Sequence, residues 1–311
     1  YQMKHFIHAV TVFSAFTFSQ TALLSCQNQD EASIIAEPET VNVTFSDVTF
    51  TFEEDNLQTR ATSVSADSAG VNRISLSVYD SRNNLKFSSQ KSASVDTEDF
   101  DKITCKLIPG AYTFVAVAHK ANADGEKAAT INSQTEAILT TAKVSRTYKA
   151  VQPVTVVKEG ANNITIAFGQ RITSTFQIKI ADETPEEVTK CEIILNPSAS
   201  ETMTYKIDLT TGLTDNVYKY SAIIERSSIK ENTFTGVCLG PQCLLTSSSQ
   251  NVTATINMLN ESDEVLFTRT ISDIPLQPHR KTVAEGNFFD TSVNGGFTFN
   301  TNDDKYYPVQ L

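Results

Sequence analysis

Residues 41–52 read VNVTFSDVTFTF, and their apolar pattern decides the fold class. Apolar and polar residues alternate from Val41 to Phe45, and again from Val48 to Phe52, but one position out of phase. A period of two residues is typical of a β-strand with one buried face. An extra residue between the two runs returns the apolar side chains to that face. Ser46-Asp47 is therefore predicted to form a β-bulge or tight bend within a β-ribbon.

The remainder of the chain repeats this pattern of strands and turns. Short runs rich in Val, Ile, Thr and Phe alternate with turn signals such as Pro109-Gly110, which is typical of all-β sandwiches. The continuously apolar run 112–118 is expected in a central strand. Pro185–Val188 is predicted to form one helical turn with Thr184 as its cap. The other expected strands are 74–78, 85–87, 103–107, 148–157, 164–168, 172–180, 191–195, 205–209, 217–224, 252–258, 265–271, 282–289 and 297–299.

The chain is long enough for two domains of ordinary size. The seam is expected near Gly169, which gives an N-terminal domain over 41–168 and a C-terminal domain over 169–311. No flexible linker marks this boundary, so the two domains are expected to pack closely.

The N-terminal residues 1–25 have the features of a secretory signal peptide. A short positive stretch precedes an apolar run over 6–18, which is too short for a transmembrane helix of about 20 residues. Leu23-Leu24-Ser25-Cys26 resembles the bacterial lipobox, which implies that Cys26 is lipidated and becomes the mature N-terminus. An ordinary exported protein with Cys26 near the cut is the alternative.

Residues 26–40 then form a polar tether. Within it, residues 27–31 read QNQDE and resemble the acidic export tag of surface lipoproteins in the Bacteroidetes. These features predict an outer-membrane lipoprotein that is exposed on the cell surface.

Charge and cysteine content exclude several classes of function. The net charge of −11 and the pI near 4.9 argue against a nucleic-acid partner. Five cysteines are too few for a disulfide framework. Cys238 and Cys243 flank a Gly-Pro turn and could close a small disulfide loop, but the sequence does not require it. No second cysteine pair or nearby histidine supports a zinc site.

No catalytic motif emerges from the sequence. After the leader only His119 and His279 remain, and neither lies in a hydrolase or metal-binding motif. His119 ends an apolar strand and is expected to be structural. No pair of converging carboxylates can be named, so no enzyme activity, cofactor or metal is predicted. A surface glycan-binding lipoprotein of an outer-membrane uptake system stays open as an alternative, although the absence of Trp disfavours a stacking platform.

Three stretches carry a resemblance to a known family. They are LIPGAYTFVAVAH (107–119), ITIAFGQRITSTFQIKIADETPEEVTKCEIIL (164–195) and IPLQPHRKTVAEGNFF (274–289). Their L-x-x-G-x-Y, D-x-x-P-x-x-V and R-x-T-x-x-x-G-x-F-F patterns resemble those of the Bacteroidetes fimbrillin superfamily, including the FimB-type fimbrial anchors. Arg280, Thr282, Gly286 and Phe289 match the third pattern, whereas Lys281 replaces the usual Asn. The resemblance implies two tandem transthyretin-like β-sandwich domains and a role as a fimbrial subunit or anchor.

The resemblance also implies a mode of assembly. Polymerising members are cut by a trypsin-like protease after an arginine that follows the first strand, and a neighbour's C-terminal strand fills the groove that opens. The matching cut would lie between Arg60 and Ala61, where an ordinary loop arginine is the alternative, and Tyr307, Val309 and Leu311 would supply the donor strand. The implied partners are other fimbrial subunits, the outer membrane through the lipid anchor, and a host or bacterial surface ligand for cell adhesion. Anchor, stalk and tip roles are not distinguished.

Overall fold

The computed structural model describes residues 38–52, 62–123, 125–290 and 296–303. The described residues from Glu39 onward belong to one compact unit. Within the described ranges, strands make up nearly all regular structure, and the 3-10 turn η1 (Arg226–Ser228) is the single helical element. No helix in this part of the chain is long and apolar enough to cross a membrane. The predicted all-β class is confirmed.

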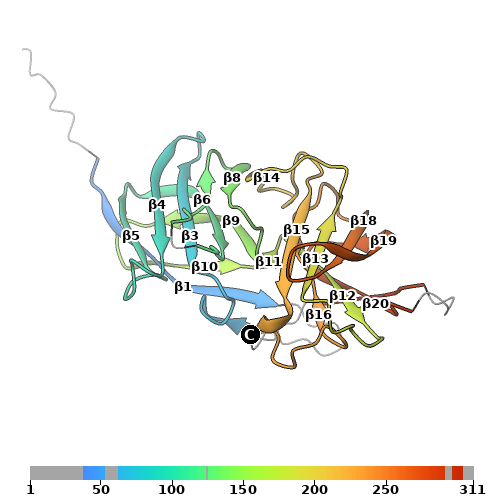
Figure 1. Ribbon diagram of the computed structural model, residues 1–311. Helices are drawn as coiled ribbons and strands as arrows, with labels where there is room; N and C mark the ends of the chain where they lie inside the picture. Colours follow the sequence, from blue (N-terminus) through green and yellow to red (C-terminus); the bar gives the residue numbers. More distant parts are fainter. Residues whose placement is uncertain (1–37, 53–61, 124, 291–295, 304–311) are drawn as a thin grey trace, which may run out of the picture. The chain divides into compact units, whose positions relative to one another are not determined.

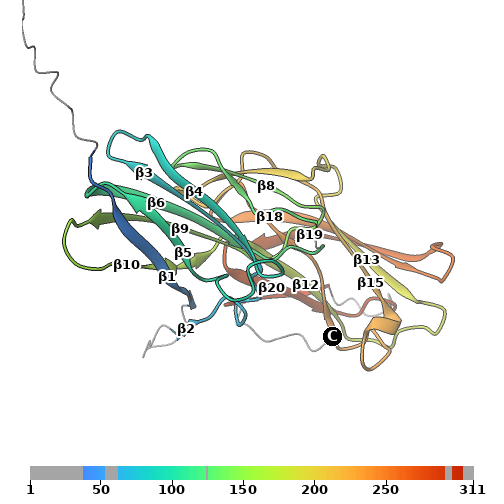
Figure 2. The same cartoon turned by 90° about the vertical axis from the view of Figure 1, so that its left-hand side faces the viewer.

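Two sheets enclose the first core (Figures 1 and 2). In sheet A, the long strand β1 pairs with β10 on one side and with β5 and β2 on the other. Sheet B has the order β11-β9-β6-β3-β4, so β6 is central, as its continuous apolar run predicted. The strands of sheet A are β1 (Val41–Phe52), β2 (Thr62–Val64), β5 (Ile103–Leu107) and β10 (Asn162–Phe168). Those of sheet B are β3 (Arg73–Asp80), β4 (Leu85–Ser92), β6 (Gly110–His119), β9 (Thr147–Val156) and β11 (Gln170–Arg171).

Two further sheets are built from the later part of the chain. Sheet D centres on the parallel pair β12 and β20, and sheet E has the order β15-β13-β18-β19. Sheet D contains β12 (Ser174–Ile180), β16 (Cys238–Leu239), β17 (Gln242–Cys243), β20 (Arg280–Gly286) and β21 (Thr298–Asp303). Sheet E contains β13 (Lys190–Leu195), β15 (Tyr220–Glu225), β18 (Gln250–Leu259) and β19 (Val265–Leu276).

A small fifth sheet, sheet C, pairs strands from the earlier and later parts of the chain. Sheet C pairs β14 (Thr204–Asp208) with β8 (Glu136–Thr140), which also pairs with β7 (Thr130–Ile131). The second core cluster contains Val115 and Val117 of β6 together with Ile207 of β14, so it is shared across sequence position 169. β11 lies after that position and still pairs with β9.

One sequence-based expectation about local structure is wrong. Pro185–Val188 forms a turn in which the Val188 N–H donates to the Pro185 carbonyl at 3.2 Å, not a helical turn. The guanidinium of Arg226 donates to the Pro185, Glu186 and Val188 carbonyls, and these bonds hold the turn. The Thr184 hydroxyl lies 3.1 Å from that of Thr235.

The sequence left a disulfide between Cys238 and Cys243 open, and the structure answers the question: both cysteines are free. They pair with Lys179 and Ser174, which are five residues apart on β12. Five residues of strand span about 16 Å, whereas a disulfide needs Cα atoms within about 7 Å. The intervening Gly240 lies so close to the backbone of β12 that a Cβ there would be 2.1 Å from the Phe176 carbonyl oxygen.

His119 is a structural residue, as its position predicted. It ends β6 and is only 1% exposed, and its Nε2 has no hydrogen-bond partner among the described residues. Removal from water penalises the charged imidazolium, so burial lowers the pKa of His119 from 6.5 to about 4.

This burial makes the fold sensitive to acid. The unfolded state takes up a proton near pH 6.5 and the folded state only near pH 4, so the stabilising contribution of neutral His119 is complete above pH 6.5 and falls as the pH drops. We expect the free energy of unfolding to fall by about 2 kcal/mol between pH 7 and pH 5 through this group. Urea unfolding at both pH values measures it, with His119→Gln as the control. An unchanged pH difference in that variant contradicts the assignment.

Candidate functional site

The place that β1 occupies in sheet A is the candidate functional site, and we call it the β1 slot. Four side chains of β1 point into the core, namely Val43, Phe45, Val48 and Phe50, and each is at most 6% exposed. Burial of such side chains contributes about 1.5–3 kcal/mol each, or about 6–12 kcal/mol together. This sum is comparable with the stability of a whole domain, about 5–15 kcal/mol. The sandwich therefore requires a strand in this place.

Both edges of β1 are occupied by backbone partners. β10 runs parallel to it from Val43↔Asn162 to Phe50↔Phe168. On the opposite edge, β5 pairs antiparallel with residues 41–45 and β2 pairs with residues 50–52. Figure 2 shows β1, β5 and β10 running side by side. One wall of the slot is therefore β10. The other wall is made of β5 and then β2, which follow one another along the opposite edge of β1.

Aromatic rings form the floor of the slot. Phe45 meets Phe114 of β6 edge to face, with ring centroids 5.5 Å apart. Phe50 stacks on Phe168 at 4.9 Å and meets Tyr148 of β9 edge to face at 4.8 Å. Such pairs contribute about 0.5–1.5 kcal/mol beyond the area they bury. Sheet B and the neighbouring strand β10 therefore supply specific ring contacts for Phe45 and Phe50.

The predicted bulge in β1 is confirmed. Asp47 has a positive φ of 53°. The register with β10 shifts between Ser46 and Thr49, because β1 advances three residues while β10 advances from Thr165 to Ala167. One extra residue of β1 is accommodated there, and Val48 and Phe50 point inward as a result.

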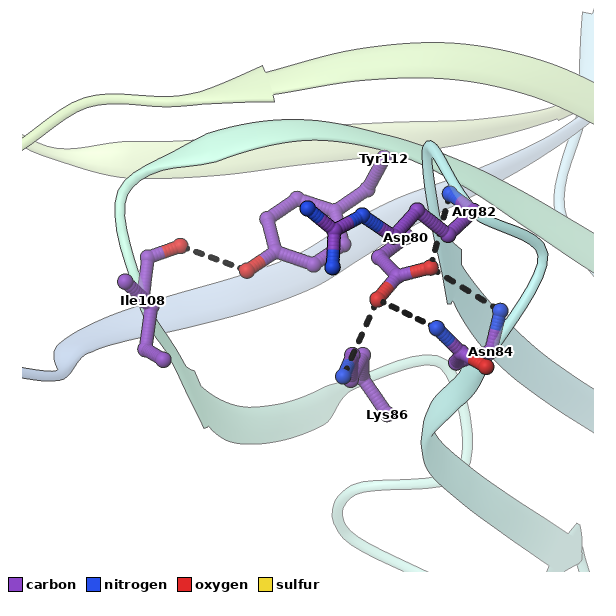
Figure 3. A network of polar contacts seen from close by, with 6 residues as sticks. All are labelled: Asp80, Arg82, Asn84, Lys86, Ile108 and Tyr112. Carbon is purple, nitrogen blue, oxygen red and sulfur yellow. Dashed lines mark hydrogen bonds and ion pairs between the residues drawn. The ribbon is translucent and has the colours of Figure 1, made fainter. Parts of the chain in front are cut away.

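A tyrosine corner fixes one wall of the slot. The Tyr112 hydroxyl donates to the Ile108 carbonyl at 2.6 Å, across the turn between β5 and β6 (Figure 3). A Tyr that bonds back to the backbone a few residues upstream braces this kind of turn in β-sandwiches. Leu107, Gly110 and Tyr112 form the L-x-x-G-x-Y pattern, and the hydrogen bond of Tyr112 explains why its last position is a tyrosine. It holds β5 against β6 at the end where Val41 pairs with Leu107.

A second polar cluster closes the neighbouring β3–β4 hairpin (Figure 3). The Asp80 carboxylate accepts the backbone N–H groups of Arg82 and Asn84, both at 2.9 Å, and forms an ion pair with Lys86 at 3.0 Å. The hydrogen bond from the Asn84 backbone is the main reason that the pKa of Asp80 lies well below its usual range. Asp80 is paired with Tyr112 across β3 and β6, so the β3–β4 hairpin and the tyrosine corner together stabilise one end of the first sandwich.

The other motifs of the resemblance meet in sheet D. The Asp182 carboxylate, just after β12, accepts the backbone N–H groups of Phe288, Phe289 and Asp290 at 2.6–2.7 Å. The Thr282 hydroxyl donates to the Pro275 carbonyl at 2.6 Å. Sequence analysis found these residues as a pattern but missed that Asp182 holds the chain at the two phenylalanines. The aspartate of D-x-x-P and the F-F pair were the available signals.

All six predicted site residues lie outside the described residues. They are Cys26, Arg60, Ala61, Tyr307, Val309 and Leu311. Their neighbours are described. Segment 53–61, which contains Arg60, joins β1 to β2, and β21 precedes Tyr307 as an edge strand of sheet D. The side chains of β21 over residues 298–302 are all exposed.

The described residues offer little for metal or glycan chemistry. No group of three or more His, Cys, Asp or Glu side chains that could hold a metal ion occurs among them. The Nδ1 atom of His279 lies 2.5 Å from the backbone carbonyl oxygen of Arg171, so this histidine contacts the main chain of the fold. Phe299 is the one exposed aromatic residue among side chains that the structure describes, at 38%. The described surface therefore presents no group of exposed aromatic side chains on which a sugar could stack.

Comparisons with known proteins connect this architecture to a family. Residues 37–302 match the model of a family described as fimbrillin-A associated anchor proteins Mfa1 and Mfa2. No curated protein sequence matches the chain.

Similar solved structures include two fimbrial proteins. The fimbrial anchor protein Mfa2 from Porphyromonas gingivalis is 11% identical, with 85% of this chain and 98% of that chain covered and a TM-score of 0.44. A fimbrial assembly protein from Parabacteroides distasonis is 8% identical, with 86% and 97% covered and a TM-score of 0.46.

Removing one inward side chain of β1 tests how much its burial contributes to the free energy of unfolding. We expect Phe45→Ala to lower the free energy of unfolding by about 3–5 kcal/mol, because it leaves a void against Phe114. Asn42→Ala, on the exposed face of the same strand, is the matched control and should change stability by less than about 0.5 kcal/mol. Urea denaturation measures both. Equal effects of the two substitutions would show that β1 is not held by its inward face.

Proposed function

The chain belongs to the family of fimbrillin-A associated anchor proteins Mfa1 and Mfa2, and on this premise we propose that it is a surface lipoprotein whose β1 slot exchanges strands with fimbrial neighbours. The protein is a fimbrial subunit or anchor. While β1 fills its own slot, the protein acts as the lipid-held anchor of a fimbria. After a cut at Arg60 it becomes a subunit that accepts a neighbour's strand. In both roles it contributes to cell adhesion as part of the fimbrium.

The observation that carries the proposal is the position of β1 along the chain. β1 lies between the predicted lipidated Cys26 and the predicted cut after Arg60, and β2 begins only at Thr62. A single cut would therefore leave β2 on the body and separate β1 from it covalently. β1 would then be held only by backbone pairing and its four buried side chains. A strand held in this way can be replaced by another that buries an equal area.

The same cut would also release the body from the membrane. Acyl chains on Cys26 would hold the protein through about 0.8 kcal/mol per buried CH₂. The 15 residue steps from Cys26 to Val41 reach at most about 50 Å from the membrane surface. Because lipid and β1 are on the same side of Arg60, displacement of β1 would remove both together. Anchoring and an open slot are then mutually exclusive states.

The chain would also act as a donor toward its neighbour. Tyr307, Val309 and Leu311 alternate with Pro308 and Gln310 and so present one apolar face. Proline is tolerated at the edge of a sheet, where no ladder hydrogen bond is lost. This stretch would fill the slot of the next subunit, whichever state the chain's own slot is in.

N-terminal analysis of native protein tests the two states. We expect the membrane-bound fraction to begin at acylated Cys26, and any fraction joined within fimbriae through its own slot to begin at Ala61. Mass spectrometry of both fractions measures this, and Arg60→Ala should leave only the acylated form. A fimbrial acceptor fraction that still carries acylated Cys26 and β1 would rule out the switch.

A reversible lock tests whether exchange uses the β1 slot. Val43 is directly opposite Cys105 in the antiparallel pairing of β1 and β5, within the reach of a disulfide. We expect oxidised Val43→Cys, made in a Cys238→Ser background, to give no polymer ladder on gels after mild trypsin treatment. Adding a reductant should restore the ladder, because β1 can then leave.

The control is Asn42→Cys, which is opposite Lys106 and cannot form the same bond. Its ladder should not depend on the reductant. Ladders from the oxidised Val43→Cys protein would place the exchange elsewhere in the molecule.

A further inference from the structure

The bulge gives the β1 slot an unequal spacing of cavities. The inward residues are Val43, Phe45, Val48 and Phe50, which stand at i, i+2, i+5 and i+7. A regular strand would place them at i, i+2, i+4 and i+6. The exposed Asp47 stands at i+4 and has a φ of 53°, a conformation that Gly, Asn and Asp adopt most easily.

The strands that flank β1 also leave room for the extra residue. On one edge of β1 the neighbour changes at this point, because β5 pairs up to Phe45 and β2 pairs from Phe50. On the other edge β10 passes from Thr165 to Ala167 while β1 passes from Ser46 to Thr49. The rings that form the floor belong to strands other than β1, namely β6, β9 and β10: Phe114 contacts Phe45, and Tyr148 and Phe168 contact Phe50.

We infer that the slot selects a partner strand with apolar side chains at i, i+2, i+5 and i+7 and with Gly, Asn or Asp at i+4. The inference rests on the proposed strand exchange and adds the chemistry of the partner to it. A strictly alternating strand can satisfy only half of the slot. Beyond the bulge its apolar side chains face solvent and its polar ones face Phe168 and Tyr148, because a shift of one residue reverses the faces of a strand.

The chain's own predicted donor does not have this pattern. Tyr307, Val309 and Leu311 stand at i, i+2 and i+4. If Tyr307 took the place of Val43, Leu311 would take that of Asp47 and need a positive φ, which is unfavourable for Leu. If Val309 took that place instead, Leu311 would fill the cavity of Phe45, and the three donor residues would not reach the cavities of Val48 and Phe50. The slot therefore suits a strand of a different fimbrial subunit better than the 307–311 stretch of a second copy.

Peptide binding to the nicked full chain tests this inference. A protease site inserted into residues 53–61 allows β1 to be cut free, and labelled peptides are then followed by fluorescence anisotropy. The probes are the native 40–53 sequence, its Asp47→Gly variant, and a peptide that lacks Asp47 and alternates strictly. We expect the first two to bind equally and the third to bind at least about tenfold more weakly, because the apolar residues that follow the bulge would point outward.

The outcomes separate the inference from the proposal beneath it. Equal binding of all three peptides would overturn the selected pattern and leave strand exchange intact. If no peptide binds, although the nicked chain keeps its fold by circular dichroism, strand exchange itself fails. Tighter binding of the alternating peptide would also overturn the inference.

The intact chain provides a second readout that does not depend on exchange. We expect Asp47→Gly to leave the melting temperature unchanged, and Asp47→Val to lower it by more than about 4 °C, because a β-branched residue is strained at positive φ. Deletion of Asp47 should lower it further. A deletion variant as stable as the native chain would show that the slot accepts strict alternation, which contradicts the inference.

Discussion

The fold of the first sandwich depends on one constraint: the core between sheets A and B is complete only when a strand lies between β10 and β5. β1 is that strand, and its four inward side chains fill cavities floored by aromatic rings of the opposite sheet and of β10. Its partners come from distant parts of the chain, since Val43 pairs with both Cys105 and Asn162. Burial of β1 therefore ties together segments that no local preference would hold. A strand that contributes so much, yet comes first in the folded chain, is both necessary to the core and separable from it.

The motif residues Tyr112 and Asp182 act through contacts to main-chain atoms outside the inward face of β1, although the same stretches also supply Phe114 and Phe168 to the slot. The tyrosine corner of Tyr112 fixes the turn after β5, and the Asp182 carboxylate holds the backbone at Phe288 and Phe289. Both are contacts to main-chain atoms, so they depend on the position of the backbone and tolerate different side chains around them. The slot is defined in the opposite way, by side-chain cavities. Main-chain contacts of this kind can persist while the slot changes its partner.

The sequence was sufficient for features whose signal is local. The phase slip at Ser46-Asp47 predicted the bulge, and the continuous apolar run over 112–118 predicted the central position of β6. Pairing between distant strands was not predictable, because alternation is the same for any neighbour. The parallel contact of β1 with β10 and the sharing of sheet C across position 169 are of this kind. The Pro185 turn was misread because the carbonyls that a helix would use internally are bound by Arg226, which is distant in sequence.

The bulge depends both on the sequence of β1 and on the strands that flank it. An extra residue in one strand of a regular sheet would ordinarily disturb the ladder on both sides. Here β5 begins at Ile103, opposite Phe45, and β2 takes over the same edge at Phe50, so on this edge the extra residue lies between the two partners of β1. The gap is thus a property of the acceptor that any replacement strand must meet. Because a one-residue error reverses every following side chain, the slot can discriminate between strands of equal hydrophobicity by their spacing alone.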